Sequence, residues 1–457
     1  MTRPMRTVAR CGAALAGAAL LVIASALLTL ASLGVFATPA GAWTMELEFA
    51  GFHVRANVAG LVRLATLPGT AHLLDGRSAT TRIGTLQFAR DGTSLRVTCA
   101  PCRLRHRKLA AAPVQFRSVA LEVRRDGDAL DGAVVVDVIR IPFEARLRAA
   151  SIDLAWQLPP TEIGTVYRVL GSAVPEAAYA RIDGTMQAQG ALSLPSGRGS
   201  ARWSADGIEV GGLGTEALQY GWFRFACSQA NGTAKLTITG DGESAWLAAD
   251  AMGPYLAAAV LAAEDQRFLQ HAGYDEHSLA VLLADFEDGG PKRGGSTITQ
   301  QLARTLFTGG DRTAARKLRE LLYAIEMERT LGKARILELY LNTVDWGPGL
   351  CGARSAARAY FGKSPARLTA LEAAWLAGVL RNPHAAWEQQ FAARQPDRTR
   401  ATQVLMQMRD WPKRERERFA EQRLAFARVP TAVRSGSGQA ASRVARAAGV
   451  SSRAVAD

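Results

Sequence analysis

The sequence predicts a multidomain protein in which a transmembrane helix precedes a β-rich antiparallel domain and an all-α domain. Three observations support this: an early apolar run, short strand-like runs broken by turn signals, and a later switch to helical periodicity. The predicted ranges are 1–10 for a cytoplasmic N-terminus, 11–36 for a transmembrane signal anchor, 44–242 for a β-rich periplasmic domain of unknown role, 243–412 for the helical domain and 413–457 for a charged to disordered C-terminal tail.

The first predicted element is the membrane anchor. Three arginines occur in the first ten residues, the next charged residue is Glu46, and residues 11–36 are strongly apolar. A helix needs about 20 apolar residues to cross a bilayer, whereas the apolar part of a signal peptide has roughly 7–15. We therefore favour an uncleaved anchor over a signal cleaved near Ala42. Either alternative exports the remainder, because the arginines keep the N-terminus in the cytoplasm.

Composition and net charge limit the chemical classes of partner that this chain can bind. The chain has 457 residues, 48 % of them hydrophobic and 21 % charged, so it can bury several cores. Its net charge of +14 suits an anionic partner. Export argues against nucleic acid and favours a phosphorylated substrate or acidic lipid.

The cysteines indicate structure rather than metal binding. Cys99 and Cys102 form a single CxxC, no second pair completes a zinc site, and a small disulfide is favoured over a redox role. Cys227 and Cys351 are left without an assigned partner.

The β-rich domain is predicted from the alternation of apolar and polar residues. Period-two runs such as Leu86–Phe88, Leu95–Val97 and Leu121–Val123 are separated by turn pairs. The predicted turns are Asp91-Gly92, Asp126-Gly127, Asp131-Gly132, Asp183-Gly184 and Asp206-Gly207. No catalytic cluster occurs here, and we interpret the domain as a spacer or partner-docking domain.

The first chemical constellation follows the switch to helical periodicity. Pro254 can open a helix on which Leu256, Val260, Glu264 and Phe268 share one stripe. A carboxylate on an apolar face tends towards a raised pKa, which suits a general base. The alternative is an ordinary glutamate at a helix end.

The second constellation is a glycine-rich loop that enters a helix. Residues 292–304 read KRGGSTITQQLAR, with Ser296 as the expected cap. Exposed amides at a helix start attract anions, and Lys292, Arg293 and Arg304 add charge. Gly295 stands where a nucleotide-binding loop needs lysine, so that interpretation is discarded. A flexible linker is the alternative.

The third constellation is Arg316-Lys317-Leu318-Arg319-Glu320, at the start of a helix with an apolar stripe. Arg316, Lys317 and Glu320 lie on one flank of that helix, where i,i+3 and i,i+4 ion pairs form. Taken alone, they are ordinary surface pairs.

Further motifs complete a recognisable series. They are Arg335-Ile-Leu-Glu338-Leu-Tyr340-Leu-Asn342, Trp346-Gly347, Gly349, Gly352, Ala356-Ala357, Tyr360-Phe361-Gly362-Lys363, Leu376-Ala377-Gly378 and Asn382-Pro383. In this order, with the three constellations, they resemble the peptidoglycan glycosyltransferase family, which occurs as monofunctional biosynthetic transglycosylases and as a module of class A penicillin-binding proteins. The resemblance implies a lysozyme-like helical fold and polymerisation of lipid II by inverting transfer, with release of undecaprenyl pyrophosphate.

The resemblance also implies residue roles. Glu264 matches the general base and Glu320 the second catalytic carboxylate, while Arg304, Arg316 and Lys317 match cations that stabilise the leaving pyrophosphate. The other positions implied to bind substrate are Asp265, Phe268, His271, Arg293, Ser296, Thr299 and Gln301. The family usually has lysine where this chain has Arg304, and it usually lacks a large β-rich domain.

The implied surroundings are those of cell-wall synthesis. A divalent cation, Mg²⁺ or Mn²⁺, is expected at the pyrophosphate, with no organic cofactor. The expected partners are lipid II, the growing glycan strand, inner-membrane lipids and a separate transpeptidase, since no serine begins an SxxK motif. The expected location is the bacterial inner membrane, with the catalytic domain in the periplasm. An apolar patch at 279–286 is a predicted membrane-docking segment.

Two other functions agree less well with these residues. A lytic glycosidase with Glu264 as acid would have no use for a cationic cluster. A degenerate scaffold would be expected to lack a catalytic carboxylate, and both Glu264 and Glu320 are present.

Overall fold

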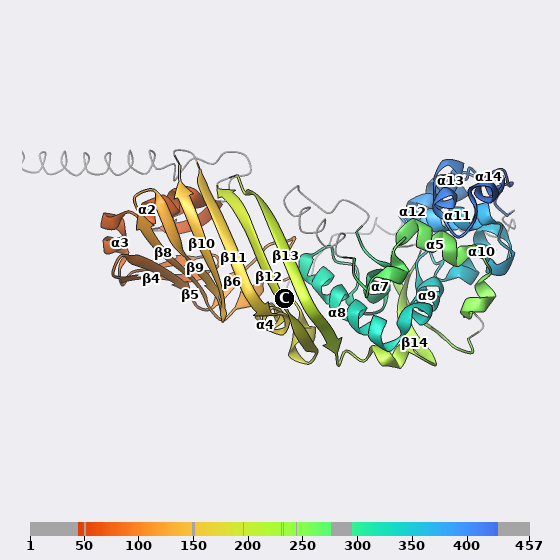
Figure 1. Cartoon of the computed structure of the whole chain (residues 1–457), viewed down its shortest axis with the longest axis horizontal. Helices are drawn as coiled ribbons and strands as arrows, with labels where there is room; N and C mark the ends of the chain where they lie inside the picture. Colours follow the sequence, from red (N-terminus) through yellow and green to blue (C-terminus); the bar gives the residue numbers. More distant parts are fainter. Residues whose placement is uncertain are drawn as a thin grey trace, which may run out of the picture. The chain divides into compact units, whose positions relative to one another are not determined.

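The computed structural model (Figure 1) describes residues 44–49, 52–148, 151–194, 196–229, 231, 233–243, 245–275 and 295–427. Several expectations lie outside these residues: the cytoplasmic N-terminus at 1–10, the anchor at 11–36, the membrane-docking patch at 279–286, the basic residues Lys292 and Arg293, and the tail beyond residue 427. Within the described ranges, no helix combines the length and the apolarity that a bilayer span requires.

Contacts between residues divide the chain into two compact units. The first contains Met1–Gln219 and Gln270–Gly332, and the second contains Tyr220–Leu269 and Lys333–Asp457. This division differs from the predicted domain boundary at residue 242, because the segment 270–332 of the predicted helical domain belongs to the same unit as the sheet.

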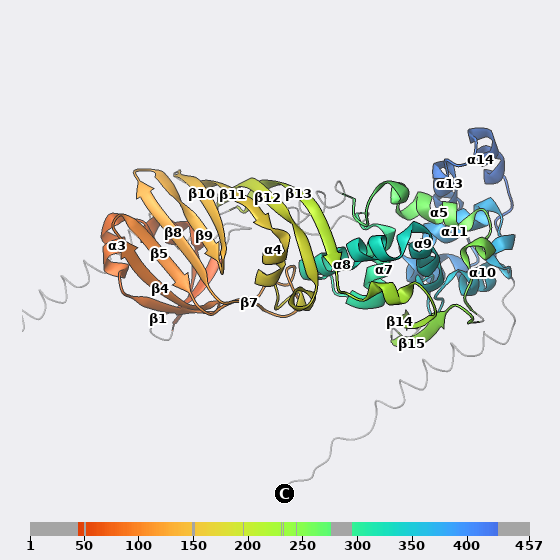
Figure 2. The same ribbon diagram turned by 60° about the horizontal axis from the view of Figure 1, so that its bottom comes forward.

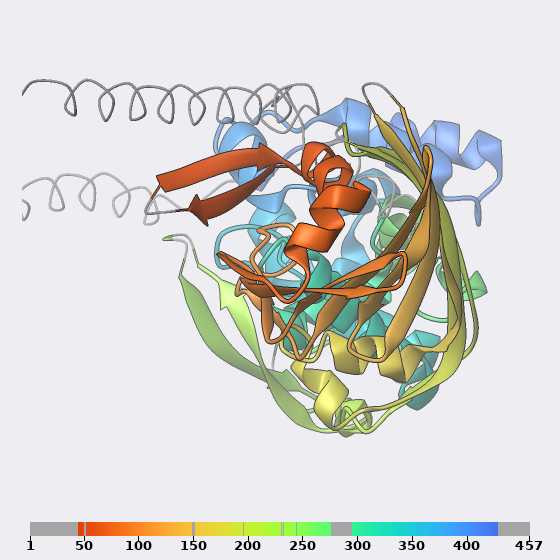
Figure 3. The ribbon, with the colours of Figure 1, turned by 90° about the vertical axis from the view of Figure 1, so that its left-hand side faces the viewer.

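The first unit is built on an eleven-stranded antiparallel sheet, which confirms the predicted β-rich region. Figure 3 shows that the sheet is strongly curved. Its strands, in their order across the sheet, are β13 (Arg198–Gly211), β12 (Arg181–Leu194), β11 (Ile152–Glu162), β10 (Ile139–Leu147), β9 (Ala129–Val136), β8 (Val119–Asp126), β5 (Ser94–Cys99), β4 (Gly84–Asp91), β3 (Ser78–Thr81), β1 (Thr44–Phe49) and β2 (Phe52–Asn57).

Two of the five predicted turns are correct and three are wrong. Gly92 and Gly127 adopt positive φ between β4 and β5 and between β8 and β9. The other three Asp-Gly pairs lie within strands. Gly132 is required by close strand pairing, since a Cβ there would come within 1.9 Å of the carbonyl oxygen of Glu122. Gly184, with φ of +103°, lies at a register shift in β12.

Short elements cover the sheet and connect it to the helices of the first unit. They are α2 (Val58–Ala65), α3 (Pro68–Leu74), β6 (Cys102–Leu104), β7 (Val114–Phe116), α4 (Ile163–Val169), the 3₁₀ helices η1 (Pro175–Ala178) and η2 (Thr215–Leu218), α7 (Ile298–Ala303), the π-helical turn η5 (Arg304–Thr308) and α8 (Ala314–Thr330). Cys99 and Cys102 form a disulfide and are buried, as predicted for a structural pair.

The second unit is mainly helical (Figure 2). Its elements are the hairpin β14 (Trp222–Ser228) and β15 (Ala234–Gly240), the 3₁₀ helices η3 (Ala249–Met252), η4 (Phe268–Gln270) and η6 (Pro365–Arg367), the helices α5 (Leu256–Glu264), α9 (Gly332–Thr343), α10 (Ala353–Phe361), α11 (Ala370–Val379), α12 (Pro383–Ala386), α13 (Arg398–Gln407) and α14 (Lys413–Ala420), and the π-helical turn η7 (Trp387–Phe391). Its core contains fully buried Trp346, Tyr360 and Trp375.

Two features of the second unit were not foreseen. Cys227 of β14 is bonded to Cys351, 124 residues later, which ties the hairpin to the segment after α9. The charged segment after Pro412 begins with α14, and its buried Phe419 packs against Tyr255 at 5.5 Å between ring centroids.

Candidate functional site

The glycine-rich loop leads into α7 through a capping box. Thr297, not Ser296 as expected, is the N-cap: its side chain accepts from the backbone of Gln300, whose side chain accepts from the backbone of Thr297. The Thr297 hydroxyl also donates to the carbonyl of Gly273 at 2.7 Å. Gly273 lies against α8, where a Cβ would come 2.7 Å from the carbonyl oxygen of Ala324. The correction leaves the Ser296 side chain available for another contact.

Helix α8 carries the predicted cation cluster on its first turns. The Thr313 side chain caps the helix by accepting from the backbone of Arg316. Glu320 has 1 % of its side chain exposed and pairs with both Arg316 and Lys317, the latter at 2.8 Å. Arg316 also donates to the carbonyl of Asp311. Since the buried carboxylate engages two cations, it holds both of them in place.

Lys317 joins this cluster to the loop before α7. Its Nζ donates to the hydroxyl of Ser296 at 2.5 Å and to the side-chain oxygen of Gln300 at 3.3 Å. Burial holds the pKa of Lys317 below its usual value, the charges of Arg316 and Arg304 lower it further, and the facing carboxylate opposes the shift. Three cations beside one carboxylate form a site suited to an anionic group.

Other predicted residues of the first unit have structural partners. The fully buried Thr299 donates to Glu328 at 2.6 Å. The backbone carbonyl of Gln301 accepts from the Thr305 hydroxyl at 3.0 Å. His271 accepts, through Nδ1, a hydrogen bond of 3.2 Å from the backbone of Gly273. These contacts shape the loops around α7.

Glu264, in the second unit, is the last residue of α5. Leu256 and Val260 of that helix are fully buried, and Glu264 is half-buried. The predicted continuous stripe to Phe268 is wrong, because Asp265 ends the helix and Phe268 begins the 3₁₀ helix η4. Helix α5 packs on α11 and α13, and this packing fixes the position of the Glu264 carboxylate at the end of the helix.

The Phe268 side chain is buried and does not form an exposed binding surface. Only 1 % of it is exposed, and the Lys333 ammonium lies over its ring, 4.3 Å from the centroid. Asp265 adjoins it as the C-cap of α5. The aromatic ring therefore secures the turn that follows Glu264.

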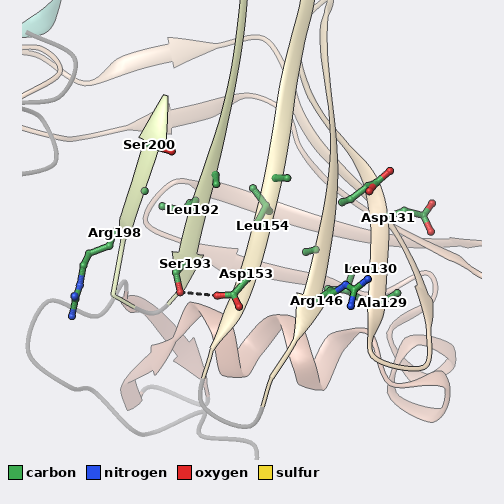
Figure 4. Close-up of a pocket in the computed structure, with 15 residues that line it drawn as sticks. Ala129, Leu130, Asp131, Arg146, Asp153, Leu154, Leu192, Ser193, Arg198 and Ser200 are labelled. Atoms are coloured by element: carbon green, nitrogen blue, oxygen red, sulfur yellow. Dashed lines mark hydrogen bonds between the residues drawn. The ribbon is translucent and has the colours of Figure 1, made fainter. Parts of the chain in front are cut away.

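A hollow on the sheet is separate from these residues. It is lined by parts of strands β9 to β13, and none of the predicted site residues belongs to its lining. Figure 4 shows Asp153 there, accepting from Ser193 at 2.9 Å. Among the residues that the structure describes, no group of three or more His, Cys, Asp or Glu side chains is arranged to hold a metal.

The sequence patterns did not predict the role of Gln300 or the contacts between α8 and the β-rich region. Gln300 binds Lys317 while completing the capping box, and its position three residues after Thr297 was the available signal. Arg319, treated only as part of a charged run, pairs with buried Glu176, 143 residues earlier. A separation of that length leaves no local signal.

Comparisons with known proteins concern the helical part of the chain. Residues 231–409 match the family model described as Transglycosylase. The chain is 46 % identical over 138 residues to the biosynthetic peptidoglycan transglycosylase of Brucella suis biovar 1 (strain 1330), covering 30 % of this chain and 62 % of that protein. It is 48 % identical over 139 residues to the protein of the same name from Nitrobacter winogradskyi, with 30 % and 62 % covered. The match thus spans about three fifths of the length of these relatives.

Proposed function

Residues 231–409 of this chain belong to the transglycosylase family, and on that premise we propose that the protein polymerises lipid II into peptidoglycan glycan strands. The observation that carries the proposal is the pairing of Arg316 and Lys317 with buried Glu320, with the charge of Arg304 acting on Lys317. Glycosyl transfer from a lipid pyrophosphate releases a multiply charged anion, and a fixed group of cations stabilises that charge as it develops.

In the proposed reaction, Glu264 takes the proton from the acceptor 4-hydroxyl. The oxygen then forms a bond to the anomeric carbon of the donor, with inversion, as the bond from that carbon to the pyrophosphate breaks. The electron pair leaves with undecaprenyl pyrophosphate, so the leaving group needs cations more than a proton. A half-buried carboxylate at the end of a rigid helix is suited to such general base work.

Glu320 acts, in this proposal, by organising the cations. Both of its oxygens are engaged, one by Arg316 and the other by Lys317. A carboxylate in this position keeps two like charges side by side, which would otherwise repel each other. Lys317 also donates a hydrogen bond to the Ser296 hydroxyl. The Glu320 side chain is therefore proposed as a positioning group for the pyrophosphate site and not as a second base.

The remaining expectations are part of the same proposal. A divalent cation, Mg²⁺ or Mn²⁺, would add charge at the pyrophosphate, but the described residues offer no ligand cluster for it and no step is assigned to it. The catalytic region is proposed to act in the periplasm on the inner membrane. Cross-linking of the product is assigned to a separate transpeptidase.

The test is polymerisation of labelled lipid II by the detergent-purified full chain, with products separated by length on a gel. Wild type should produce long glycan. Glu264→Gln, which keeps the side-chain shape but removes the base, should reduce the rate by at least about 10²-fold. A matched control is Glu388→Gln, an exposed glutamate outside the proposed machinery, which should polymerise like wild type.

Different outcomes separate the alternatives. Failure of folded wild type to polymerise lipid II, with Mg²⁺ or Mn²⁺ supplied, would refute the proposal and favour the scaffold alternative. Shortening of preformed glycan strands would instead indicate a lytic glycosidase. Equal polymerisation by wild type and Glu264→Gln would retain the activity and reject Glu264 as the base.

A further inference from the structure

The β-rich region of the first unit contacts α8 from the first turn of the helix to its last. Arg319, Glu326 and Thr330 share one face of α8, because residues seven and eleven apart return to the same side. Lys317 and Glu320 point about 100° or more away from Arg319 around the helix, and Arg316, three residues before Arg319, lies between the two sets. The cation cluster and the contacts with the β-rich region are thus carried by neighbouring parts of one rigid helix.

The β-rich region caps the start of α8. The backbone N–H groups of Ala314 and Ala315 donate to the carbonyls of Lys108 and Leu109, at 2.7 and 2.9 Å. These carbonyls belong to the loop between β6 and β7, and the side chain of Ala315 packs in a small core with Val114 of β7. First-turn N–H groups have no partner within a helix, so this loop fixes where α8 begins.

An ion pair between partly exposed Arg319 and buried Glu176 fixes the next turn. Arg319 donates from Nε to both carboxylate oxygens of Glu176, at 2.8 and 2.9 Å, and Glu176 has only 2 % of its side chain exposed. Glu176 lies in η1, directly before β12. The Tyr167 hydroxyl of α4 donates to the carbonyl of Leu318 at 3.1 Å. The contacts at the adjacent residues Leu318 and Arg319 resist both rotation and sliding of α8.

The second half of α8 is attached to the loop after β13. Glu326, with no exposed surface, accepts from the backbone of Leu213 at 2.9 Å and from the backbone and hydroxyl of Thr215 at 3.3 and 2.9 Å. Arg329 donates to the carbonyl of Val210 at 3.3 Å. Apolar contacts of Leu321, Leu322 and Ile325 with α4 and β13 fill the space between these polar ties.

We propose that the β-rich region is a positioning element of the glycosyltransferase site, acting through Glu176 and Arg319 to set the rotation of α8 and hence the placement of Arg316 and Lys317. This inference rests on the proposed function. Displacing catalytic groups by about 1 Å can cost 10²-fold in rate, so a helix that carries two of the three cations requires firm support. The β-rich region is therefore part of the enzyme and not a spacer.

The test compares Glu176→Gln with a matched control in the full-length protein. Glu176→Gln keeps the size of the side chain but leaves Arg319 facing a neutral group. Glu372→Gln is the control, because Glu372 is a buried partner of Lys363 in the other compact unit. Tyr167→Phe is a milder second variant, which removes only the hydroxyl that donates a hydrogen bond to the Leu318 carbonyl.

We expect Glu176→Gln to lower kcat for lipid II polymerisation by about 10-fold or more, with KM changed by less than about 3-fold, because positioning acts on the transition state. Tyr167→Phe should give a smaller loss in the same direction. Backbone hydrogen exchange should quicken in the first turns of α8 in Glu176→Gln but not in Glu372→Gln. Glu372→Gln should keep the wild-type kcat, even if it melts at a lower temperature.

The outcomes distinguish this inference from the proposed function. Wild-type kcat and unchanged exchange of α8 in folded Glu176→Gln would overturn the inference and leave the enzyme assignment intact. If wild type does not polymerise lipid II, the proposed function fails, and hydrogen exchange alone decides whether Glu176 positions α8. A loss of kcat as large in Glu372→Gln as in Glu176→Gln would show a general stability effect and overturn the inference.

Discussion

The disulfide between Cys227 and Cys351 should stabilise the second unit far more than the other disulfide stabilises the sheet. The Cys227–Cys351 pair closes a segment with a sequence separation of 124, whereas Cys99 and Cys102 are separated by 3. In the chain-entropy model, the lost freedom of the unfolded chain is worth about 5 kcal/mol for the long loop and about 1.6 kcal/mol for the short one. The predicted difference is roughly 3 kcal/mol.

The assay uses two double variants, Cys227→Ser with Cys351→Ser and Cys99→Ser with Cys102→Ser. Equilibrium urea unfolding would be followed by hydrogen exchange and mass spectrometry of peptides from α9 and from β5, so each unit is measured separately. We expect the α9 peptides to lose several kcal/mol of opening free energy in the first variant and the β5 peptides to lose less in the second. The reasoning would be refuted if both variants lost equal amounts.

Two further predictions concern charged groups of α8. Burial lowers the pKa of Lys317, so its charge should be lost as pH rises through a value below the ordinary 10.5. Polymerisation by wild type should decline at that pH, and Lys317→Arg should move the decline to higher pH. A pH–rate profile whose alkaline decline is the same in both proteins would contradict this. The same lowered pKa makes folding more favourable as pH rises between the folded and unfolded values. Glu326→Ala should cost roughly 3 kcal/mol in urea unfolding, since two backbone N–H groups lose their buried acceptor, whereas Asp131→Ala, in a half-exposed ion pair, should cost less than about 1 kcal/mol.

Local patterns predicted much of the secondary structure. Alternation identified β4, β5 and β8, and the apolar stripe after Arg316 identified α8. The i,i+3 and i,i+4 spacing correctly paired Glu320 with Lys317 and Arg316, because residues at these spacings are neighbours on any helix. Polar turn signals were less reliable: Asp131-Gly132 occurs within β9, where the absence of a side chain on Gly132 permits close strand pairing.

The end of α5 shows where periodicity fails. Leu256, Val260, Glu264 and Phe268 have perfect i+4 spacing, yet the helix ends at Glu264. Phe268 is instead buried in η4 under Lys333, and this packing is not encoded in the spacing. Capping was similarly ambiguous, because Ser296 and Thr297 are both good caps and only Thr297 completes the exchange with Gln300.

The sequence by itself determined the β-rich and helical regions, the similarity of residues 231–409 to the transglycosylase family model and the identity of the cation cluster, because these depend on residue type at short spacing. Only the tertiary structure decided what surrounds that cluster. The pairing of Cys227 with Cys351, the contact of Glu176 with Arg319 and the capping of α8 by the loop at 108–109 join residues more than 100 positions apart. Such contacts exist only after the chain has folded, since burial and close packing, rather than local propensity, select the partners.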